Sequence, residues 1–247
     1  MTDALIIADI HLSQDRPSTV DLFLHFLKRR AARSASLYIL GDLFDAWIGD
    51  DDHSHLATEI TLAFQRLTSK GTAVFIMRGN RDFLIGETFA AATGCTLLDD
   101  PAVVTLCDTP TLLMHGDLLC SDDLEYQQAR KLLRSTAFIE DFLSKSLRER
   151  VVLAAEYRKR SGEVVSLKPA DIMDVNQQTV KTYMRNNRVT RLIHGHTHRS
   201  AIHEFNLDGH PATRIVLSEW HAKRGSYLST GPDGLTSHDF IIEADYD

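Results

Sequence analysis

Five short polar fragments each follow an apolar run, and together they offer seven side chains that can bind a hard metal ion. The fragments are Asp9-x-His11, Gly41-Asp42, Gly79-Asn80-Arg81-Asp82, His115-Gly116-Asp117 and Gly195-His196-Thr197-His198. One such fragment is weak evidence, because a strand followed by Gly-Asp is usually an ordinary turn. Five in this order predict a site for two divalent ions about 3.5–4 Å apart, which requires a bridging carboxylate with terminal nitrogen and oxygen donors.

The spacing within the fragments favours convergence on one site. Residues i and i+2 of an extended backbone project to the same side, so Asp9 and His11 are expected to face the site together, as are His196 and His198. Glycines beside the ligands allow tight turns without a Cβ clash. Asp42, placed centrally in the order, suits the bridge.

The elements that must position these fragments are short apolar runs typical of buried strands. Each run ends directly before a polar fragment, and together they cover residues 5–8, 37–40, 73–77, 112–114 and 192–193. Segments 18–33 and 56–69 show helical periodicity between the first three runs. This alternation predicts an α/β core, in which functional groups gather beyond the carboxyl ends of the strands.

The segment 122–190 differs and is predicted to be a mostly helical insertion. Between residues 126 and 157 a helical stripe is formed by Ile139, Leu143, Leu147 and Val151, with Phe138 and Phe142 beside it. A second helix is expected to start near Asn176, where Asn176 caps the first turn and Val175 packs against Val180. Strand patterns return at 201–205, 213–217, 226–229 and 240–242. We therefore predict one domain, with a core of residues 1–121 and 191–247 and a cap of residues 122–190.

Composition limits the class of protein. The chain has 247 residues, 43% hydrophobic and 25% charged, which is ordinary for a globular protein. No run reaches the roughly 18 apolar residues of a membrane-spanning helix. The start runs directly into an apolar segment without the basic region or small-residue cleavage site of a signal peptide, so we expect a cytoplasmic location. Three cysteines without a C-x-x-C pair argue against disulfides and thiolate metal sites.

Charge is distributed unevenly along the chain. Between residues 122 and 191 there are 14 basic and 10 acidic residues, whereas the rest of the chain holds 13 basic and 24 acidic ones. A basic middle segment suggests an anionic partner, either phosphate or a lipid surface, although an ordinary solvated helical face is the alternative. A nuclease would need a basic groove, so the acidic core argues against nucleic acid as a partner.

In the order of its five fragments, the chain resembles the calcineurin-like metallophosphoesterase superfamily. The resemblance implies an α/β fold with a βαββ sandwich and two divalent ions at the strand ends. One ion would take Asp9, His11 and His198, the other would take Asn80, His115 and His196, and Asp42 would bridge them. It implies Mn²⁺, while four imidazoles and three oxygen ligands are also compatible with Fe or Zn.

One departure from the superfamily pattern is informative. After Gly-Asn the superfamily usually has His and Glu, where this chain has Arg81 and Asp82. The usual histidine helps an alkoxide to leave, whereas an arginine cannot donate a proton near neutral pH but can hold phosphate oxygens through two hydrogen bonds. A leaving phosphate needs no proton, so Arg81 favours cleavage of a phosphoanhydride; a surface ion pair is the alternative reading.

Longer blocks narrow the resemblance to the UDP-2,3-diacylglucosamine diphosphatases of lipid A synthesis. They are residues 41–51 (GDLFDAWIGDD), 115–123 (HGDLLCSDD), 172–176 (IMDVN) and 192–199 (LIHGHTHR), and they extend into the insertion. The resemblance implies catalytic roles for Asp42, Asn80, Arg81 and His115. It also implies substrate contacts from Asn80, Arg81, Asp123, Tyr126, Arg158, Ser161, Lys168 and His196. The stretch 162–168, interpreted as a loop, departs from the family at Val165.

The resemblance implies an enzyme that hydrolyses the pyrophosphate bond of UDP-2,3-diacylglucosamine to UMP and 2,3-diacylglucosamine 1-phosphate, and the predicted ligands fit attack of metal-activated water on phosphorus. We expect a monomer bound peripherally to the cytoplasmic face of the inner membrane, which holds its lipid-linked sugar nucleotide substrate. One alternative is a metallophosphoesterase acting on another nucleotide diphosphate or phosphodiester. The other is a metal-free binding scaffold, which should lack several of the seven ligands.

Overall fold

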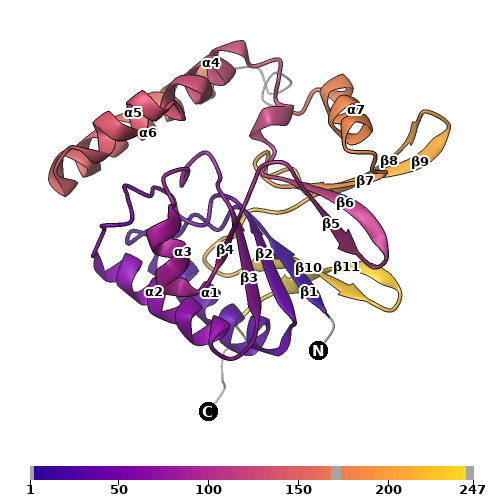
Figure 1. Ribbon diagram of the computed structural model, residues 1–247, viewed down its shortest axis with the longest axis horizontal. Coiled ribbons are helices and arrows are strands. Elements are labelled where there is room, and N and C mark those ends of the chain that lie inside the picture. The colour runs from indigo at the N-terminus through magenta and orange to yellow at the C-terminus, as the bar shows by residue number, and fades with distance from the viewer. Residues whose placement is uncertain (1–2, 168–173, 243–247) are drawn as a thin grey trace.

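The ligand-bearing fragments are positioned by a six-stranded sheet and a five-stranded sheet. The computed structural model describes residues 3–167 and 174–242. The first sheet has the order β11-β10-β1-β2-β3-β4, with β1, β2, β3 and β4 parallel (Figure 1). Its strands are β1 (Ala4–Ile7), β2 (Ser36–Leu40), β3 (Ala73–Met77), β4 (Thr96–Leu98), β10 (Gly225–Gly231) and β11 (Gly234–Phe240).

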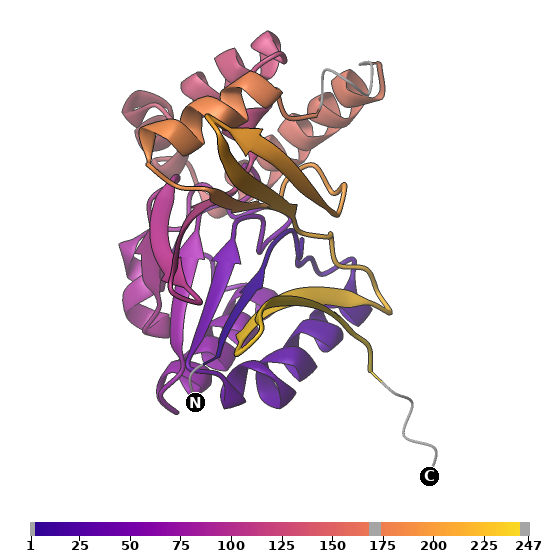
Figure 2. The same cartoon turned by 90° about the vertical axis from the view of Figure 1, so that its right-hand side faces the viewer.

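The second sheet has the order β5-β6-β7-β9-β8, in which β6, β7 and β9 run parallel. Its strands are β5 (Ala102–Leu106), β6 (Thr109–Met114), β7 (Arg191–His194), β8 (Ala201–Leu207) and β9 (His210–Val216). The two sheets lie face to face, as Figure 2 shows. The polar fragments after β1, β2, β3, β6 and β7 are thereby brought to the same end of the sandwich.

Alternation along the strands builds the layers. On β1, Leu5 and Ile7 face a core shared with helices α1 (Pro17–Arg29), α2 (His55–Thr68) and α3 (Glu87–Thr93). Ala4 and Ile6 point the opposite way, into a second core between the two sheets. On β6, Leu113 enters that second core, while its neighbours face helix α7 (Gln177–Asn186) on the outside. The result is a helix-sheet-sheet-helix sandwich, which confirms the predicted fold class.

The segment between β6 and β7 is helical, but not as one continuous stretch. It forms α4 (Leu124–Leu133), α5 (Thr136–Leu143) and α6 (Leu147–Leu167), which lie across the end of the sandwich where the polar fragments gather (Figure 1). Helix α6 continues to Leu167, so residues 162–167 are helical and the interpretation of that stretch as a loop is wrong. Asn176 caps α7 by accepting from the Thr179 N–H, as predicted, and Val175 and Val180 are buried in the same cluster.

Several short helices and strands of the structure were not predicted from the sequence. Helix α3 and strands β4 and β5 were not predicted, and the strand expected at 240–242 instead lies at Gly234–Phe240. The three cysteines are free, as expected. Among the described residues, no helix combines the length and apolarity needed to cross a membrane.

Candidate metal centre and adjoining cavity

All seven candidate ligands meet at the carboxyl ends of five strands. Asp9 and His11 follow β1, Asp42 follows β2, Asn80 follows β3, and the remaining histidines follow β6 and β7. Asp9, Asp42 and His115 are almost completely buried. Carboxylates in such positions require compensation by positive charge or hydrogen-bond donors. These fragments therefore form a buried site that requires compensating positive charge, and they are not ordinary solvent-exposed turns.

The ligands fall into two groups around Asp42. In the first group, the Nε2 atoms of His11 and His198 lie 3.3 Å apart, and His198 Nε2 lies 3.6 Å from Asp9 Oδ1. In the second group, Asn80 Oδ1 lies 2.9 Å from His115 Nε2 and 2.8 Å from His196 Nδ1.

Asp42 lies between the two groups. Its Oδ2 is 3.9 Å from His11 Nε2, and its Oδ1 is 3.8 Å from His115 Nε2. Asp9 also comes close to both groups, because its carboxylate approaches Asp42 and His115 as well as His11 and His198. A carboxylate with one oxygen toward each group has the geometry that a bridge between two ions requires.

Hydrogen bonds behind the histidines select the ring nitrogen that faces the centre. His115 Nδ1 lies 2.9 Å from the Leu40 carbonyl oxygen, which leaves Nε2 toward Asp42 and Asn80. His198 Nδ1 lies 3.0 Å from Glu219 Oε2, which leaves Nε2 toward Asp9. Such partners fix the tautomer of a metal-binding imidazole and raise its basicity. Glu219 follows β9 and belongs to none of the five fragments, so the spacing of those fragments did not predict it.

The backbone at the centre is strained. Five of the nine described non-glycine residues with positive φ are candidate ligands: Asp9 (55°), His11 (51°), Asp42 (52°), His196 (69°) and His198 (56°). The expectation that these pairs lie on extended backbone is therefore wrong, although each side chain still reaches the site. Such conformations cost of order 1–3 kcal/mol each and persist only where the surroundings enforce them. Strain concentrated in one place marks it as functional.

Asp82 supplies part of that enforcement. It is completely buried, and its Oδ1 accepts from the Gly79 N–H at 2.7 Å while its Oδ2 accepts from the Leu43 N–H at 2.8 Å. Longer bonds come from the N–H groups of Asp42 and Phe44. One carboxylate thus ties the turn that carries Asp42 to the turn that carries Asn80. Asp82 belongs to the third polar fragment and departs from the superfamily pattern, but its sequence position alone did not predict this supporting role.

Two glycines leave the ligands room. A Cβ on Gly79 would stand 2.1 Å from Asp42 Oδ1, and a Cβ on Gly195 would stand 2.3 Å from Asp9 Oδ2. Neither glycine has a positive φ. Their role is close approach of backbone to a ligand side chain, which any side chain would block.

The charges at the centre match a divalent cation. Burial raises the pKa of Asp42 to about 7. Burial lowers the pKa of His115, but the charges of Asp42, Asp117 and Asp9 outweigh that effect and raise it to about 9. In the same way, Asp9 and Glu219 overcome burial and raise the pKa of His198 to about 10. Protons on these two imidazoles neutralise the carboxylates, and divalent cations can supply the same positive charge. Imidazole, carboxylate and amide donors suit Mn²⁺, Fe or Zn.

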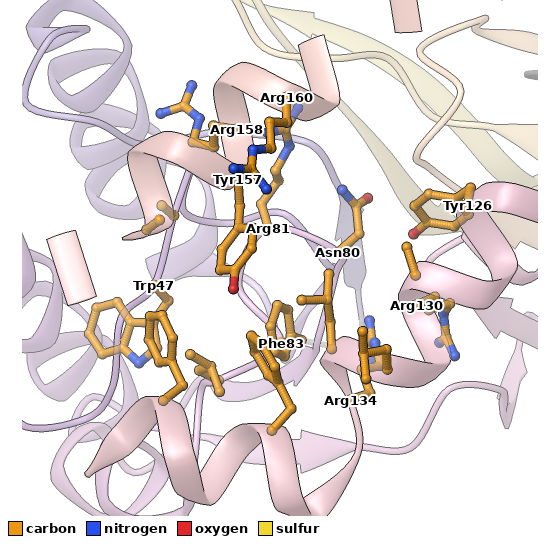
Figure 3. A pocket seen from close by; sticks show the side chains of 18 of the residues that line it. Trp47, Asn80, Arg81, Phe83, Tyr126, Arg130, Arg134, Tyr157, Arg158 and Arg160 are labelled. Carbon is orange, nitrogen blue, oxygen red and sulfur yellow. The ribbon is translucent and has the colours of Figure 1, made fainter. Parts of the chain in front are cut away.

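A cavity of about 380 Å³ opens beside the centre, between the core and helices α4, α5 and α6 (Figure 3). Its walls are largely apolar, with contributions from Trp47, Phe83, Leu84, Ala129, Leu132, Leu133, Phe138, Phe142 and Tyr157. Arginines 81, 130, 134, 158 and 160 also line it. A site with apolar walls and several guanidinium groups suits a ligand that has both apolar chains and phosphate.

Five of the predicted substrate contacts line this cavity: Asn80, Arg81, Asp123, Tyr126 and Arg158. His196 does not line it but lies in the second ligand group, with its ring centroid 5.9 Å from that of Tyr126. Arg158 forms an ion pair with Asp45 on the core. Lys168 lies outside the described residues. Ser161 belongs to α6, and its side chain is likewise outside the description.

The predicted apolar stripe of the insertion has a divided role. Phe138 and Phe142 line the cavity, whereas Ile139 and Leu147 pack against the core cluster. Leu143 and Val151 are exposed. The stripe therefore serves both to seal the helices onto the core and to form the cavity wall.

The sequence of the chain is similar to those of known proteins. Residues 3–200 match the calcineurin-like phosphoesterase family. A protein of Chromohalobacter salexigens named UDP-2,3-diacylglucosamine hydrolase is 47% identical over 90% of both chains. Proteins of the same name from Stutzerimonas stutzeri and Salmonella typhi are 42% and 46% identical, covering 96% and 94% of this chain and 99% and 96% of their own. The chain therefore belongs to the calcineurin-like phosphoesterase family, alongside relatives named UDP-2,3-diacylglucosamine hydrolase.

Proposed function

We propose that this protein hydrolyses the pyrophosphate bond of UDP-2,3-diacylglucosamine to UMP and 2,3-diacylglucosamine 1-phosphate. The observation that carries the proposal is the cavity, which joins apolar walls to a cluster of arginines and opens on Asn80 and Arg81 next to the ligand centre. The names of relatives 42–47% identical over most of their length support the same substrate.

The proposed cofactor is a pair of divalent ions, Mn²⁺ in our assignment. Asp9, His11 and His198 would hold one ion and Asn80, His115 and His196 the other, with Asp42 shared. When bound, such ions lower the pKa of water towards about 7 and neutralise phosphate oxygens. The protein's contribution is a set of ligand side chains, four of them buried, which Leu40, Asp82 and Glu219 hold in place.

Arg81 is proposed to hold the phosphate oxygens during cleavage. It lines the cavity beside Asn80 (Figure 3). Its backbone N–H donates to Asp42 Oδ1 at 2.8 Å, so its position is tied to the proposed bridging carboxylate. A guanidinium can bind two oxygens at once and remain charged at every physiological pH. Asp123, Tyr126, Arg158, Ser161 and Lys168 are proposed as further substrate contacts.

We propose that residues 122–190 act as a cap over a core of residues 1–121 and 191–247. Arg150 of α6 is buried, forms two hydrogen bonds of 2.6 and 2.7 Å with Asp51, and donates to the Ile48 carbonyl oxygen. Arg134 donates to the Gly79 carbonyl oxygen at 2.9 Å. These contacts close the cavity between cap and core, where the acyl chains of the substrate would lie.

The cap also suggests how the protein reaches its substrate. Leu124, Leu132, Val151 and Val152 are exposed on α4 and α6, within a segment that carries a net positive charge. Basic residues near an anionic bilayer contribute about 1 kcal/mol each. We propose that the protein works as a monomer on the cytoplasmic face of the inner membrane, without crossing it.

Product analysis tests the proposed function. The protein is incubated with UDP-2,3-diacylglucosamine and Mn²⁺, and the products are identified by mass. Parallel reactions contain a UDP-sugar without acyl chains, DNA, or EDTA. We expect UMP and the diacyl sugar phosphate, strong preference for the acylated substrate, and reversible loss of turnover with EDTA. Preferential cleavage of the soluble UDP-sugar or of DNA, or turnover in EDTA, would reject the proposal.

A further inference from the structure

Helix α4 forms one wall of the cavity without being held by apolar packing. None of its residues, Leu124–Leu133, is buried. Leu124 and Leu132 are exposed, and only Tyr126, Gln127, Arg130 and Leu133 are partly covered. A helix without buried residues must be positioned by polar contacts, since packing supplies most of the tertiary stability of a helix.

Those polar contacts converge on the loop that follows His115. Asp117 is completely buried, and its Oδ2 accepts hydrogen bonds from the Tyr126 hydroxyl at 2.8 Å and from Arg130 Nε at 2.6 Å. Gln127 Nε2 donates to the Asp117 carbonyl oxygen at 2.8 Å and to that of Cys120 at 3.2 Å. Tyr126 and Gln127 lie four and three residues before Arg130, which places all three on one face of α4.

The same loop carries a candidate metal ligand. Asp117 is two residues from His115, and Tyr126, which Asp117 holds by its hydroxyl, lies with its ring 5.9 Å from that of His196. One turn further along, Arg134 reaches the Gly79 carbonyl oxygen, next to Asn80. The position of the cavity wall relative to the second ligand group therefore depends on the buried Asp117 carboxylate and its neighbours, with Asp100 Oδ2 at a longer 3.9 Å from Arg130.

We infer that Asp117 is a positioning residue, which fixes helix α4 relative to the metal centre and so places the acylated substrate for attack. Asp117 does not itself line the cavity; it acts through its contacts with Tyr126, Gln127 and Arg130. The inference rests on the proposed function for its substrate. It predicts that a change at Asp117 affects substrates that fill the cavity more than substrates that touch only the metals.

The test compares two substrates. Asp117→Asn keeps the size of the side chain and an acceptor for Tyr126 but removes the charge that holds Arg130. With the Mn²⁺-loaded full chain, KM for UDP-2,3-diacylglucosamine is expected to rise about tenfold, as for a modest misplacement of a binding group. The rate with a small chromogenic phosphodiester should change far less, and the Mn²⁺ electron paramagnetic resonance spectrum should stay that of wild type.

A matched control is Asp141→Asn on α5, which removes an exposed ion pair with Lys145, outside the cavity. It should leave both substrates unaffected. Equal losses on both substrates with Asp117→Asn, a changed Mn²⁺ spectrum, or no change in KM would each overturn the inference. Absence of turnover of UDP-2,3-diacylglucosamine by the wild type would instead reject the proposed function.

A second variant keeps the inference testable if Asp117→Asn does not fold. Gln127→Ala removes the two bonds to the carbonyl oxygens of Asp117 and Cys120, and Gln127 does not line the cavity. It should raise KM for the diacyl substrate selectively, in the same direction as Asp117→Asn. If Gln127→Ala leaves KM unchanged, the loop of Asp117 does not position α4 for substrate binding.

Discussion

Glu219 lies directly behind His198, with Oε2 3.0 Å from Nδ1. The side-chain hydrogen bond with His198 lowers the pKa of Glu219, so the carboxylate is charged at neutral pH. It orients the imidazole so that Nε2 points toward Asp9, where the first ion is proposed to bind. This pair gives the first ligand group an anionic support, whereas His115 in the second group is oriented by a neutral backbone carbonyl.

Glu219→Gln is therefore expected to weaken one ion selectively. Loss of an outer carboxylate behind a metal-binding histidine typically costs 10–100-fold in metal affinity or activity. Titration of the apo-protein with Mn²⁺ should show one site weakened by about that factor and the other little changed. Excess Mn²⁺ should restore much of the turnover. Equal weakening of both sites would contradict the assignment of His198 to one ion only.

Asp42→Ala is expected to cost more than His11→Ala. Asp42 faces both ligand groups, whereas His11 faces only the first. Removal of the bridge should leave turnover below about a tenth of normal even with metal in excess, because both ions lose a ligand. Metal content after dialysis and kcat are measured for both variants. An Asp42→Ala protein that remains more active than His11→Ala would show that the carboxylate does not bridge.

Arg81→Ala is expected to lower kcat/KM. The loss should correspond to about 2–4 kcal/mol of transition-state stabilisation, as for removal of an electrostatic donor. Arg81→Lys should recover only part of this, because an ammonium keeps the charge but not the planar pair of donors. Arg66→Ala, an exposed change on α2 outside the cavity, is the control. Full activity of Arg81→Lys would mean that charge alone matters at this position.

Leu132→Gln is expected to raise KM for the diacyl substrate. Leu132 lines the cavity and is 65% exposed, so its replacement should not disturb folding, unlike that of Phe142, which is only 4% exposed. The acyl chains of the substrate leave an apolar bilayer when they enter the cavity. Each methylene group that the cavity does not shield from water costs about 0.8 kcal/mol of binding free energy. Leu124→Gln is the matched control, because Leu124 lies on the same helix, is 69% exposed and does not line the cavity. Equal effects of the two changes would argue for general membrane contact instead of the cavity.

Much of the metal centre was predictable because each candidate ligand directly follows the end of a buried strand. Buried strands such as 73–77 have a distinctive apolar signature, and the polar residues after parallel strands must gather at one edge of the sheet. That reasoning located Asp42, Asn80 and His115 by the ends of β2, β3 and β6. It failed for the backbone, because the left-handed conformations of Asp9 and His11 depend on hydrogen bonds to the neighbouring turn, through Gly41 and Asp42.

The supporting residues could not be found in the same way. Glu219 and Asp117 acquire their roles only from partners brought together by the fold, at sequence separations that no local pattern records. The periodicity of the insertion predicts helix, but it does not predict the breaks that end α4 at Leu133 and α5 at Leu143. Ser135 caps α5 by accepting a hydrogen bond from the Phe138 N–H, and a serine at this position is a sequence signal for the start of a helix.

The most direct test of the account is hydrolysis of UDP-2,3-diacylglucosamine in ¹⁸O-labelled water with Mn²⁺, followed by mass analysis of both products. We expect attack on the phosphorus nearer uridine, so UMP should carry one ¹⁸O atom and the diacyl sugar phosphate none. The wild type should show this labelling, and EDTA should abolish both turnover and labelling. Label in the diacyl sugar phosphate would place the substrate in the opposite orientation, and release of UDP would contradict cleavage of the pyrophosphate bond altogether.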